Sequence, residues 1–415
     1  METFPYHDGR LFGEQVPLES IAERFGTPTY VYSRNRILSN FQRLAKAFCD
    51  VSCLICYSVK ANSNLAILKL VREAGAGFDI VSGGELARLE RVGADPRSAV
   101  FSGVGKTASE IDAALGARIL MFNVESAGEL EMIESRARAR AQREPAGISI
   151  RINPNVAAET HPYISTGETI HKFGVTPGTA LDLYRRTAAS PHLKVRGIAC
   201  HIGSQILSVE PFLEALDELL ALAEQLRDLG ITVEDLDLGG GFGIRYADEP
   251  PLELERLARE ISARIRPTPY RLILEPGRAL VGDAGILLTR VLYVKQNPEK
   301  NFVITDAGMN DLMRPALYGS YHEIVPAGRQ SEKRVLADVV GPLCETGDFL
   351  ARDRELPETQ PGDLLAVLNA GAYGYVLASN YNSRPRPAEV LVNGSEMQLV
   401  GRRESLEELL SRESA

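Results

Sequence analysis

The chain has 415 residues and a formal net charge of −9 at pH 7, with 24% charged and 44% hydrophobic residues. A single hydrophobic core stops growing at about 250–300 residues, so this length predicts two domains. The acidic balance and the lack of a basic cluster argue against a nucleic acid partner. Residues 1–8 lack the basic and apolar regions of a signal peptide, and no apolar run reaches the ~18–20 residues of a membrane helix. We therefore expect a cytoplasmic protein without membrane contact.

The cysteine, histidine and glycine patterns argue against several kinds of structural and binding site. Five cysteines are too few for a disulfide framework, and the six histidines show no metal-ligand spacing, so no metal is expected. The run 103–107 (GVGKT) resembles the end of a phosphate-binding P-loop, but Val100 stands where that motif needs a glycine. The run 239–243 (GGGFG) is not a dinucleotide fingerprint, because Ile244 replaces the last glycine.

The first two thirds of the chain alternate between strand and helix patterns. Two strand-like segments, 9–16 and 29–32, come first and could pair with the first strand of this alternation. Strands are then expected at 54–59, 77–81, 99–102, 119–123, 148–153, 195–200, 233–238 and 272–275. Amphipathic helices lie between them, for example at 63–74, 84–92, 126–140 and 210–229. The rhythm predicts a (β/α)8 TIM-type barrel over residues 26–275, with an open doubly wound sheet as the alternative.

The pattern changes after residue 275. Strand-like stretches separated by Gly, Pro, Asn and Asp turns follow at 285–294, 301–306, 334–340, 363–368, 388–392 and 396–400. Residues 404–411 look helical again. This pattern predicts a C-terminal β-sandwich or small β-barrel domain, built from residues 276–415 and recruiting the N-terminal segment 1–25.

Nearly every expected barrel strand ends in a polar or glycine-rich element. In chain order these are Lys60, Asp79 with Ser82, Ser102 with Gly103, Asn123, Arg151 with Asn153, His201 with Ser204, Gly239–Gly241 and Glu275–Arg278. Each could be a turn or a helix cap by itself. Because barrel enzymes carry their chemistry at the C-terminal ends of the strands, the set predicts one active site.

A lysine, a glycine-rich loop, a carboxylate and an arginine on one rim suit pyridoxal 5'-phosphate. Lysine is rarely buried without a reason, and the Lys60 amine can bond to the aldehyde of this cofactor. The N–H groups of Gly239–Gly241 can approach a phosphate closely, because glycine has no Cβ. A carboxylate beside the pyridine nitrogen keeps the ring protonated and electron-withdrawing, and Glu275 is placed for that task.

Several motifs then resemble a known family. The runs 57–62 (YSVKAN), 78–85 (FDIVSGGE), 201–205 (HIGSQ), 239–243 (GGGFG) and 275–278 (EPGR) resemble the fold-type III pyridoxal-phosphate-dependent decarboxylases. The runs 161–167 (HPYISTG), 309–318 (MNDLMRPALY), 341–348 (GPLCETGD), 371–374 (GAYG) and 381–387 (YNSRPRP) resemble the diaminopimelate decarboxylases within that group. The resemblance implies decarboxylation of meso-2,6-diaminopimelate to L-lysine and carbon dioxide in lysine biosynthesis. It also implies a head-to-tail homodimer with composite active sites.

The resemblance assigns a role to individual residues. It implies that Lys60 carries the cofactor and that His201 stacks on its ring. It implies that Cys344 reaches in from the partner subunit and returns a proton after carbon dioxide leaves. The implied cofactor contacts are Lys60, Asp79, His201, Ser204, Gly240, Gly241, Glu275, Pro276, Gly277, Arg278 and Tyr373. The implied substrate contacts are Arg278, Arg314 and Tyr318 for the distal carboxylate, Glu345 for the distal ammonium, and Tyr373.

Four alternatives stay open at this point. An ornithine- or arginine-type decarboxylase would share Lys60 but leave Arg314 without a carboxylate to bind. Alanine racemase resembles this group but places an arginine, not a glutamate like Glu275, beside the pyridine nitrogen. A related decarboxylase could act on a carrier-bound or diacid amino acid in another pathway, and a non-catalytic cofactor-binding protein would not need Cys344. The loop 156–159 lacks an aspartate often found in the family, which leaves the behaviour of an active-site lid near 155–175 open.

Overall fold

The computed structural model describes residues 3–140, 144–156, 172–328 and 331–414. The motif at 161–167 and most of the expected lid lie outside these residues. The chain divides into two compact units, which we call the barrel unit and the sheet unit. The barrel unit comprises Phe41–Ile244 and Pro250–Gly277, and the sheet unit comprises Met1–Asn40, Arg245–Glu249 and Arg278–Ala415.

The barrel unit is a closed ring of eight parallel strands in the order β10-β11-β12-β5-β6-β7-β8-β9. The strands are β5 (Cys53–Ser58), β6 (Gly77–Ile80), β7 (Ala99–Phe101), β8 (Met121–Val124), β9 (Ala146–Arg151), β10 (Leu193–Ala199), β11 (Asp235–Asp237) and β12 (Arg271–Leu274). The predicted barrel is confirmed. The open sheet is excluded, because β12 pairs with β5 and closes the ring.

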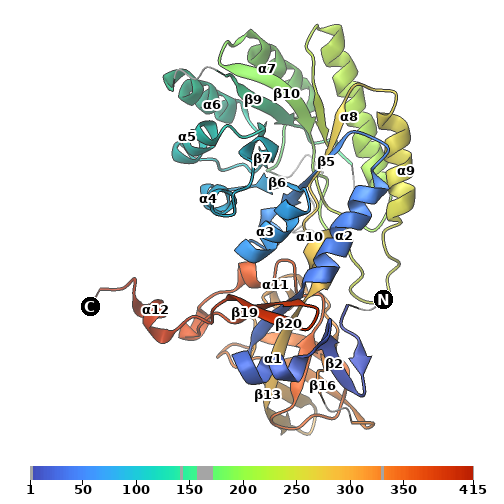
Figure 1. Ribbon diagram of the computed structural model, residues 1–415, viewed down its shortest axis with the longest axis vertical. Helices are drawn as coiled ribbons and strands as arrows, with labels where there is room; N and C mark the ends of the chain where they lie inside the picture. The colour runs from blue at the N-terminus through green and yellow to red at the C-terminus, as the bar shows by residue number, and fades with distance from the viewer. Residues whose placement is uncertain (1–2, 141–143, 157–171, 329–330, 415) are drawn as a thin grey trace. The chain divides into compact units, whose positions relative to one another are not determined.

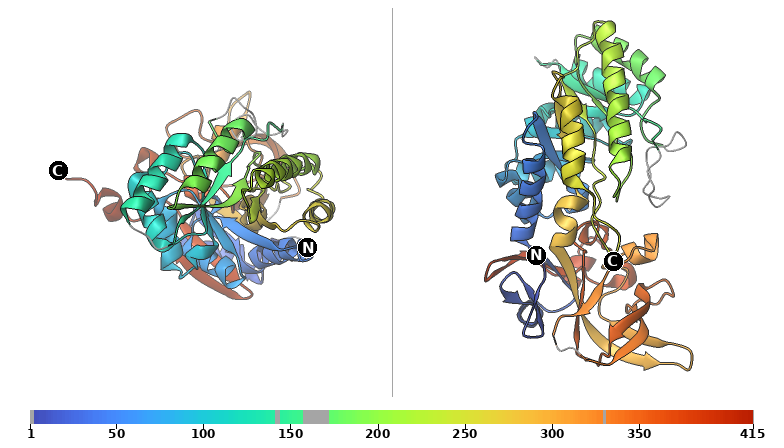
Figure 2. Two further views of the ribbon diagram at one scale, coloured as in Figure 1. Left: turned by 90° about the horizontal axis from the view of Figure 1, so that it is seen from above. Right: turned by 90° about the vertical axis from the view of Figure 1, so that its right-hand side faces the viewer.

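Helices surround these strands (Figure 1; Figure 2, left). They are α3 (Leu65–Glu73), α4 (Gly83–Arg91), α5 (Ala108–Ala117), α6 (Ala127–Ala139), α7 (Pro177–Ala189), α8 (Glu210–Asp228) and α9 (Leu254–Ile265), while α2 (Arg34–Ala47) spans the boundary between the units. Ser82, Thr107 and Ser126 start three consecutive helices, and each accepts a hydrogen bond from the backbone N–H of a glutamate three residues on. This capping satisfies free N–H groups at the helix starts, directly after the strand ends where the site lies.

The sheet unit contains a branched nine-stranded sheet. Its main path is β17-β16-β14-β13-β4-β19-β20, and β18 pairs with both β13 and β15. The strands are β4 (Thr29–Ser33), β13 (Gly285–Gln296), β14 (Asn301–Thr305), β15 (Ile324–Pro326), β16 (Arg334–Val340), β17 (Phe349–Pro357), β18 (Leu364–Val367), β19 (Ala388–Asn393) and β20 (Glu396–Gly401). A small sheet of β1 (Tyr6–His7), β2 (Arg10–Gly13) and β3 (Val16–Pro17) precedes α1 (Leu18–Phe25). Three short helices, α10 (Arg278–Val281), α11 (Arg314–Tyr318) and α12 (Leu406–Leu410), complete the unit.

The N-terminal part of the sheet unit extends to Asn40, beyond the boundary expected near residue 25. All five residues of β4 are buried, and β4 pairs antiparallel with β13 and parallel with β19. A strand that is buried on both sides needs two neighbours to satisfy its backbone groups, and the sheet provides them. The segment 29–32 therefore belongs to the sheet unit and does not pair with the first barrel strand.

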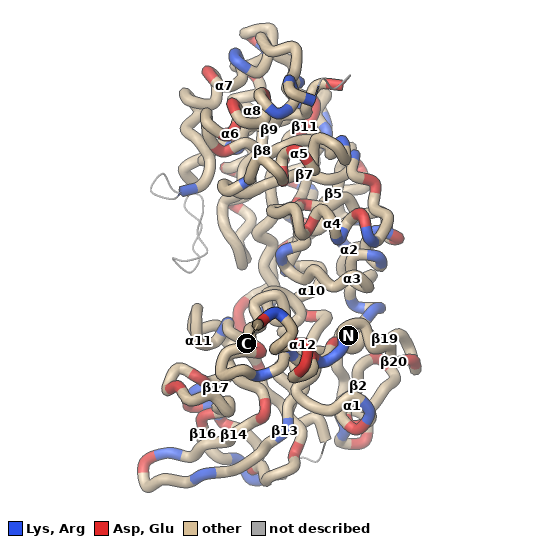
Figure 3. The backbone as a smooth tube through the Cα atoms, turned by 90° about the vertical axis from the view of Figure 1, so that its left-hand side faces the viewer, with Lys and Arg blue, Asp and Glu red and all other residues tan. Residues whose placement is uncertain are grey.

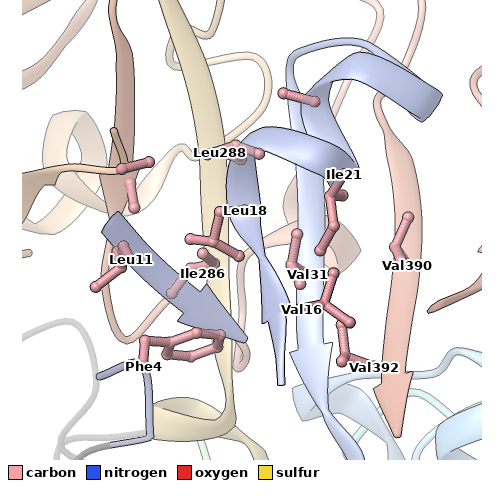
Figure 4. Packing of buried hydrophobic residues seen from close by; sticks show 13 residues of the cluster. Phe4, Leu11, Val16, Leu18, Ile21, Val31, Ile286, Leu288, Val390 and Val392 are labelled. Atoms are coloured by element: carbon pink, nitrogen blue, oxygen red, sulfur yellow. The ribbon is translucent and has the colours of Figure 1, made fainter. Parts of the chain in front are cut away.

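The core of the sheet unit joins both ends of the chain (Figure 4). Phe4, Leu11, Val16, Leu18 and Ile21 from the N-terminal segment pack against residues of β4, β13 and β19. The partners labelled in Figure 4 are Val31, Ile286, Leu288, Val390 and Val392. Burial of these apolar side chains is the physical reason why the C-terminal sheet recruits the N-terminus.

Charged residues of both signs are interspersed along each unit (Figure 3). Arg186 of α7, for example, pairs with Glu131 of α6 at 2.7 Å on the barrel surface. Among the described residues, no helix is long and apolar enough to cross a membrane.

Candidate active site

Lys60 lies in a short 3-10 turn, Val59–Ala61, directly after β5. Its Nζ lies 2.6 Å from Oδ2 of Asp79, a fully buried residue of β6. The Ser58 hydroxyl donates to the same oxygen at 2.8 Å. The second oxygen, Asp79 Oδ1, is buried and accepts no hydrogen bond from the described residues. The turn therefore holds the lysine ammonium beside a buried carboxylate that can take a further donor.

Glu275 follows β12 and is 4% exposed. Its Oε1 lies 3.4 Å from both Ser102 Oγ and Asn123 Nδ2. The same Asn123 nitrogen donates to Asp237 Oδ2 at 3.0 Å, so one amide joins two buried carboxyl groups. Burial, followed by the charges of Asp237 and Asp79, raises the pKa of Glu275. Burial also raises the pKa of Asp237, to about 6. The pair is therefore suited to hold a proton.

The glycine-rich loop follows β11 and packs tightly. A Cβ at Gly240 would lie 2.2 Å from the carbonyl oxygen of Glu275, so no side chain fits there. Gly241 has φ +96°, and a Cβ there would meet the Gly203 carbonyl at 2.6 Å. Only glycine allows the loop backbone to approach the neighbouring strand ends this closely.

His201 follows β10 and contacts this loop. The Gly240 N–H donates to His201 Nδ1 at 3.1 Å. A ring nitrogen that accepts carries no proton, so the proton of the neutral ring is on Nε2. Burial, together with the charges of Arg151 and Lys60, lowers the pKa of His201. The ring is therefore neutral near pH 7.

The segment after His201 is fastened to the glycine loop. Gln205 forms two hydrogen bonds with the backbone of Ile244, through its amide nitrogen at 2.5 Å and its oxygen at 3.2 Å. This holds the half-buried Ser204 beside the loop. After the neighbouring strand β12, Pro276 accepts a hydrogen bond from Ser58 N at 3.1 Å. A Cβ at Gly277 would lie 2.9 Å from Ala61 Cβ, so Gly277 allows the chain to pass close to the lysine turn.

These strand ends enclose a cavity of about 210 Å³ within the barrel unit. Its lining residues are Lys60, Val81, Ser102, Gly103, Asn123, Arg151, Phe173, Ala199, Cys200, His201 and Glu275. A reactive amine, a buried carboxyl group, a flat neutral imidazole and a nearby glycine-rich loop are the groups that pyridoxal phosphate needs. The unsatisfied Asp79 Oδ1 and the space that a Cβ would fill at Gly240 fit this cofactor.

Arg151 lines the cavity and is held by Glu125. Arg151 Nη1 donates to Glu125 Oε1 at 3.1 Å, and the guanidinium lies 4.9 Å from the Phe173 ring centre. Both carboxylate oxygens of Glu125 also accept backbone N–H groups, from Gly103 and Gly174 at 3.0 Å each. The sequence places Arg151 at a strand end but does not indicate Glu125 or Phe173, because their partners are distant in the chain.

In the sheet unit, Arg278, Arg314 and Tyr373 are brought together around Tyr246. The Tyr246 hydroxyl oxygen accepts from Arg278 Nη1 at 2.6 Å and from Arg314 Nη1 at 3.0 Å. The Arg278 guanidinium also lies 4.9 Å from the Tyr373 ring centre. Tyr373 itself has φ +55°, a strained conformation of the kind that clusters at functional sites. Tyr318 lies at the end of α11 and influences the pKa of Arg278.

Cys344 and Glu345 lie exposed on the surface of the sheet unit. The Cys344 N–H donates to Asn382 Oδ1 at 2.9 Å, and the Tyr381 hydroxyl hydrogen bonds to Glu345. Within the described part of the chain, neither residue forms a hydrogen bond or ion pair with Arg314. The residues expected around the substrate therefore form two separate groups in the sheet unit.

Known proteins resemble the whole chain. A family model for the pyridoxal binding domain of pyridoxal-dependent decarboxylases matches residues 34–282. Diaminopimelate decarboxylase of Neisseria meningitidis serogroup A is 51% identical over 405 residues, covering 98% of this chain and 99% of that protein. The Pseudomonas aeruginosa enzyme of that name is 50% identical, with 100% and 99% covered. The crystal structure of diaminopimelate decarboxylase from Helicobacter pylori complexed with L-lysine has a TM-score of 0.92 at 42% identity, covering 95% of this chain and 98% of that one. The chain belongs to the diaminopimelate decarboxylases, within the family of pyridoxal-dependent decarboxylases.

Proposed function

We propose that the residues of the barrel rim and of the sheet unit together carry out the decarboxylation of meso-2,6-diaminopimelate. The enzyme is a carbon–carbon lyase that uses pyridoxal phosphate and yields L-lysine and carbon dioxide. The observation that carries this function is identity of about half the residues along the full length of curated diaminopimelate decarboxylases. The cavity that joins Lys60, His201 and Glu275 supports it.

When bound, pyridoxal phosphate supplies an aldehyde for covalent attachment and a ring that withdraws electrons from the carbon that loses carbon dioxide. Lys60 provides the amine, and Asp79 keeps that amine positioned. The Glu275 carboxylate would keep the pyridine nitrogen protonated, and the flat His201 ring would stack on the pyridine and orient it. Ser204, Gly240, Gly241 and the segment Pro276, Gly277 and Arg278 hold the phosphate, together with Tyr373.

The substrate has a second amino acid head group that does not react. Arg278, Arg314 and Tyr318 bind its carboxylate, and Tyr373 contacts the substrate beside them. A guanidinium suits this task because it donates through two N–H groups in a fixed plane. Glu345 binds the distal ammonium.

Cys344 protonates the substrate carbon after carbon dioxide has left. A thiol is a suitable proton donor near neutral pH. The exposure of Cys344 and Glu345 supports their contribution to the active site of a partner subunit. We infer that the enzyme acts as a homodimer with composite active sites, and we propose the cytoplasm as its location.

Carbon dioxide release from meso-diaminopimelate, compared with ornithine, arginine and lysine, tests the function. We expect carbon dioxide release from meso-diaminopimelate to be at least about a hundred-fold faster than from the other three amino acids. A charge-assisted contact is worth about 1.5–3 kcal/mol, and the distal head group of meso-diaminopimelate gains several such contacts. Lys60→Ala should abolish release. Faster release from ornithine or arginine would contradict the proposal. Release from none of the four would favour a related decarboxylase of another amino acid.

A further inference from the structure

Arg314 is a buried cation with only neutral partners. It is 5% exposed, and its guanidinium contacts the Tyr246 hydroxyl at 3.0 Å, His322 Nε2 at 2.8 Å and the Ser320 hydroxyl at 3.3 Å. Within the described ranges it forms no ion pair. Burial lowers the pKa of Arg314, the direction expected for a cation without an anionic partner.

Two other buried cations, Arg151 and Lys106, are neutralised by ion pairs. Arg151 is 8% exposed and pairs with Glu125 at 3.1 Å. The Lys106 side chain is 1% exposed and pairs with Glu129 at 2.6 Å. Since an unpaired buried charge is strongly destabilising, an arginine surrounded by neutral groups needs a reason. An anionic ligand that completes the ion pair is such a reason.

His322 is held in a neutral form. Its Nδ1 lies 2.8 Å from the Leu368 carbonyl oxygen, which can only accept, so Nδ1 carries the proton. Its Nε2 faces an Arg314 N–H, which can only donate, so Nε2 accepts. Both contacts together fix one neutral tautomer. His322 is fully buried, and burial lowers its pKa to about 3.

Tyr246 joins a second guanidinium to the first. Its single oxygen accepts from Arg278 at 2.6 Å and from Arg314 at 3.0 Å. The two guanidinium carbons lie 5.7 and 4.8 Å from the centre of the Tyr246 ring, within the range of cation–π attraction. Tyr246 thereby holds two like charges near each other without cancelling either.

We propose that Tyr246 and His322 are positioning residues that determine specificity: they orient Arg314 through neutral contacts and so keep its charge available for the second carboxylate of a diacid amino acid. The inference rests on the proposed binding of the distal carboxylate by Arg314. An amino acid that ends in an amine leaves that charge unpaired. Because Tyr246 and His322 are neutral, the charge of Arg314 is paired only when the substrate brings a second carboxylate. The enzyme therefore selects against lysine and ornithine.

The first test compares two substitutions of His322. His322→Gln keeps a neutral group that can accept from Arg314, whereas His322→Glu places a carboxylate against it. We expect His322→Glu to raise KM for meso-diaminopimelate at least tenfold more than His322→Gln does, with a smaller effect on kcat. We also expect weaker inhibition of His322→Glu by pimelate, which has both carboxylates and no amine. Equal KM values for the two variants would overturn the inference.

The second test removes the shared acceptor. Tyr246→Phe should raise KM for meso-diaminopimelate about tenfold, because each guanidinium loses an oriented contact. Tyr184→Phe is the matched control: its hydroxyl is also buried and donates to the Gly197 carbonyl at 2.7 Å, in the barrel wall. This control should lower the melting temperature and leave KM unchanged. An unchanged KM in Tyr246→Phe would overturn the role of Tyr246.

A variant that fails to fold must be distinguished from one that binds the substrate less tightly. Absorbance of the bound cofactor shows that each variant is folded and loaded. If His322→Glu fails this check, Ser320→Asp places the carboxylate at the half-buried third partner of Arg314, and the same rise in KM is expected. If the unsubstituted enzyme does not act on meso-diaminopimelate, the proposed function itself has failed. If it does and neither acidic variant raises KM, only this inference has failed.

Discussion

At the residue scale, the Asn123 amide allows two carboxyl groups, Asp237 and Glu275, to be buried close together in the barrel. Its amide nitrogen lies 3.0 Å from Asp237 Oδ2 and 3.4 Å from Glu275 Oε1. The Gly239 N–H donates to the other Asp237 oxygen at 3.0 Å. Asp237 is fully buried, and its pKa rises to about 6 because burial disfavours the charged form.

This raised pKa predicts how stability depends on pH. An aspartate in an unfolded chain titrates at about 3.9, so between about pH 4 and 6 the folded enzyme keeps a proton that the unfolded chain has lost. The stabilisation from Asp237 is complete below about pH 4 and is lost as the pH rises through about 6. Asp237→Asn has no such group. The unfolding free energy of the enzyme relative to this variant should fall by on the order of 2–3 kcal/mol between about pH 4 and 7.

Urea unfolding of the cofactor-free proteins across this range measures the difference. Glu275 titrates together with Asp237, so the difference between the two proteins reports the proton that this pair of carboxyl groups holds. A difference that stays constant with pH would show that Asp237 does not hold the extra proton.

At the element scale, Glu125 ties three chain segments to the end of β8. It pairs with Arg151 of β9, and it accepts backbone N–H groups of Gly103 after β7 and of Gly174 before α7. Val175 then pairs with Ile152 as a further bridge to the end of β9. A single buried carboxylate thus fixes the loops that border the cavity.

Breaking this pair should cost more than breaking a surface pair. Removing one partner of a buried ion pair costs about 3–5 kcal/mol, so Glu125→Gln should lower the unfolding free energy by that order. The double variant Glu125→Gln with Arg151→Met should recover part of the loss, because it removes the unpaired charge. Glu131→Gln, which breaks the exposed pair with Arg186, should cost under ~1 kcal/mol.

Chemical denaturation of these three variants and of the unsubstituted enzyme completes the comparison. If Glu125→Gln costs no more than Glu131→Gln, the buried pair does not anchor the loops.

At the scale of the whole molecule, the sheet unit presents Cys344 and Glu345 on its exposed surface. A proton donor that acts in an enclosed site must be covered when it acts. In the proposed homodimer, the active site of the other subunit covers it. Lys60 and Cys344 would then act in one active site but belong to different chains.

Mixing two inactive variants tests this assembly. Lys60→Ala and Cys344→Ala should each be inactive, and their mixture should recover up to about a quarter of the activity. Random exchange makes about half of the dimers mixed, and each mixed dimer has one intact site of two. Mass spectrometry should first show that subunits have exchanged. Absence of recovery after exchange would place Cys344 in the site of its own chain.

The barrel and the residues at its rim could be predicted from the amino-acid sequence. The periodicity of a strand or helix can be recognised within its own segment of the sequence. The parallel strands of a barrel all end at the same face, so the residues at their C-terminal ends lie near one another. Lys60, Asp79, His201 and Glu275 could therefore be assigned to a common rim from their places in the alternation. The strands β15 and β17 were not expected, because β15 has three residues and charged residues in β17, such as Arg352, Asp353 and Arg354, hide its strand pattern.

The contacts between residues that are distant in the chain could not be predicted in this way. Tyr246 is 68 positions from Arg314 in the chain, and the Leu368 carbonyl that fixes the His322 tautomer is 46 positions from that histidine. The pairing of β4 with β13 and β19 likewise depends on contacts between the two ends of the chain. Periodicity records which face of an element is buried, but it carries no information about the partner that buries it. The neutral surroundings of Arg314 arise from such partners, and they are set by packing in three dimensions.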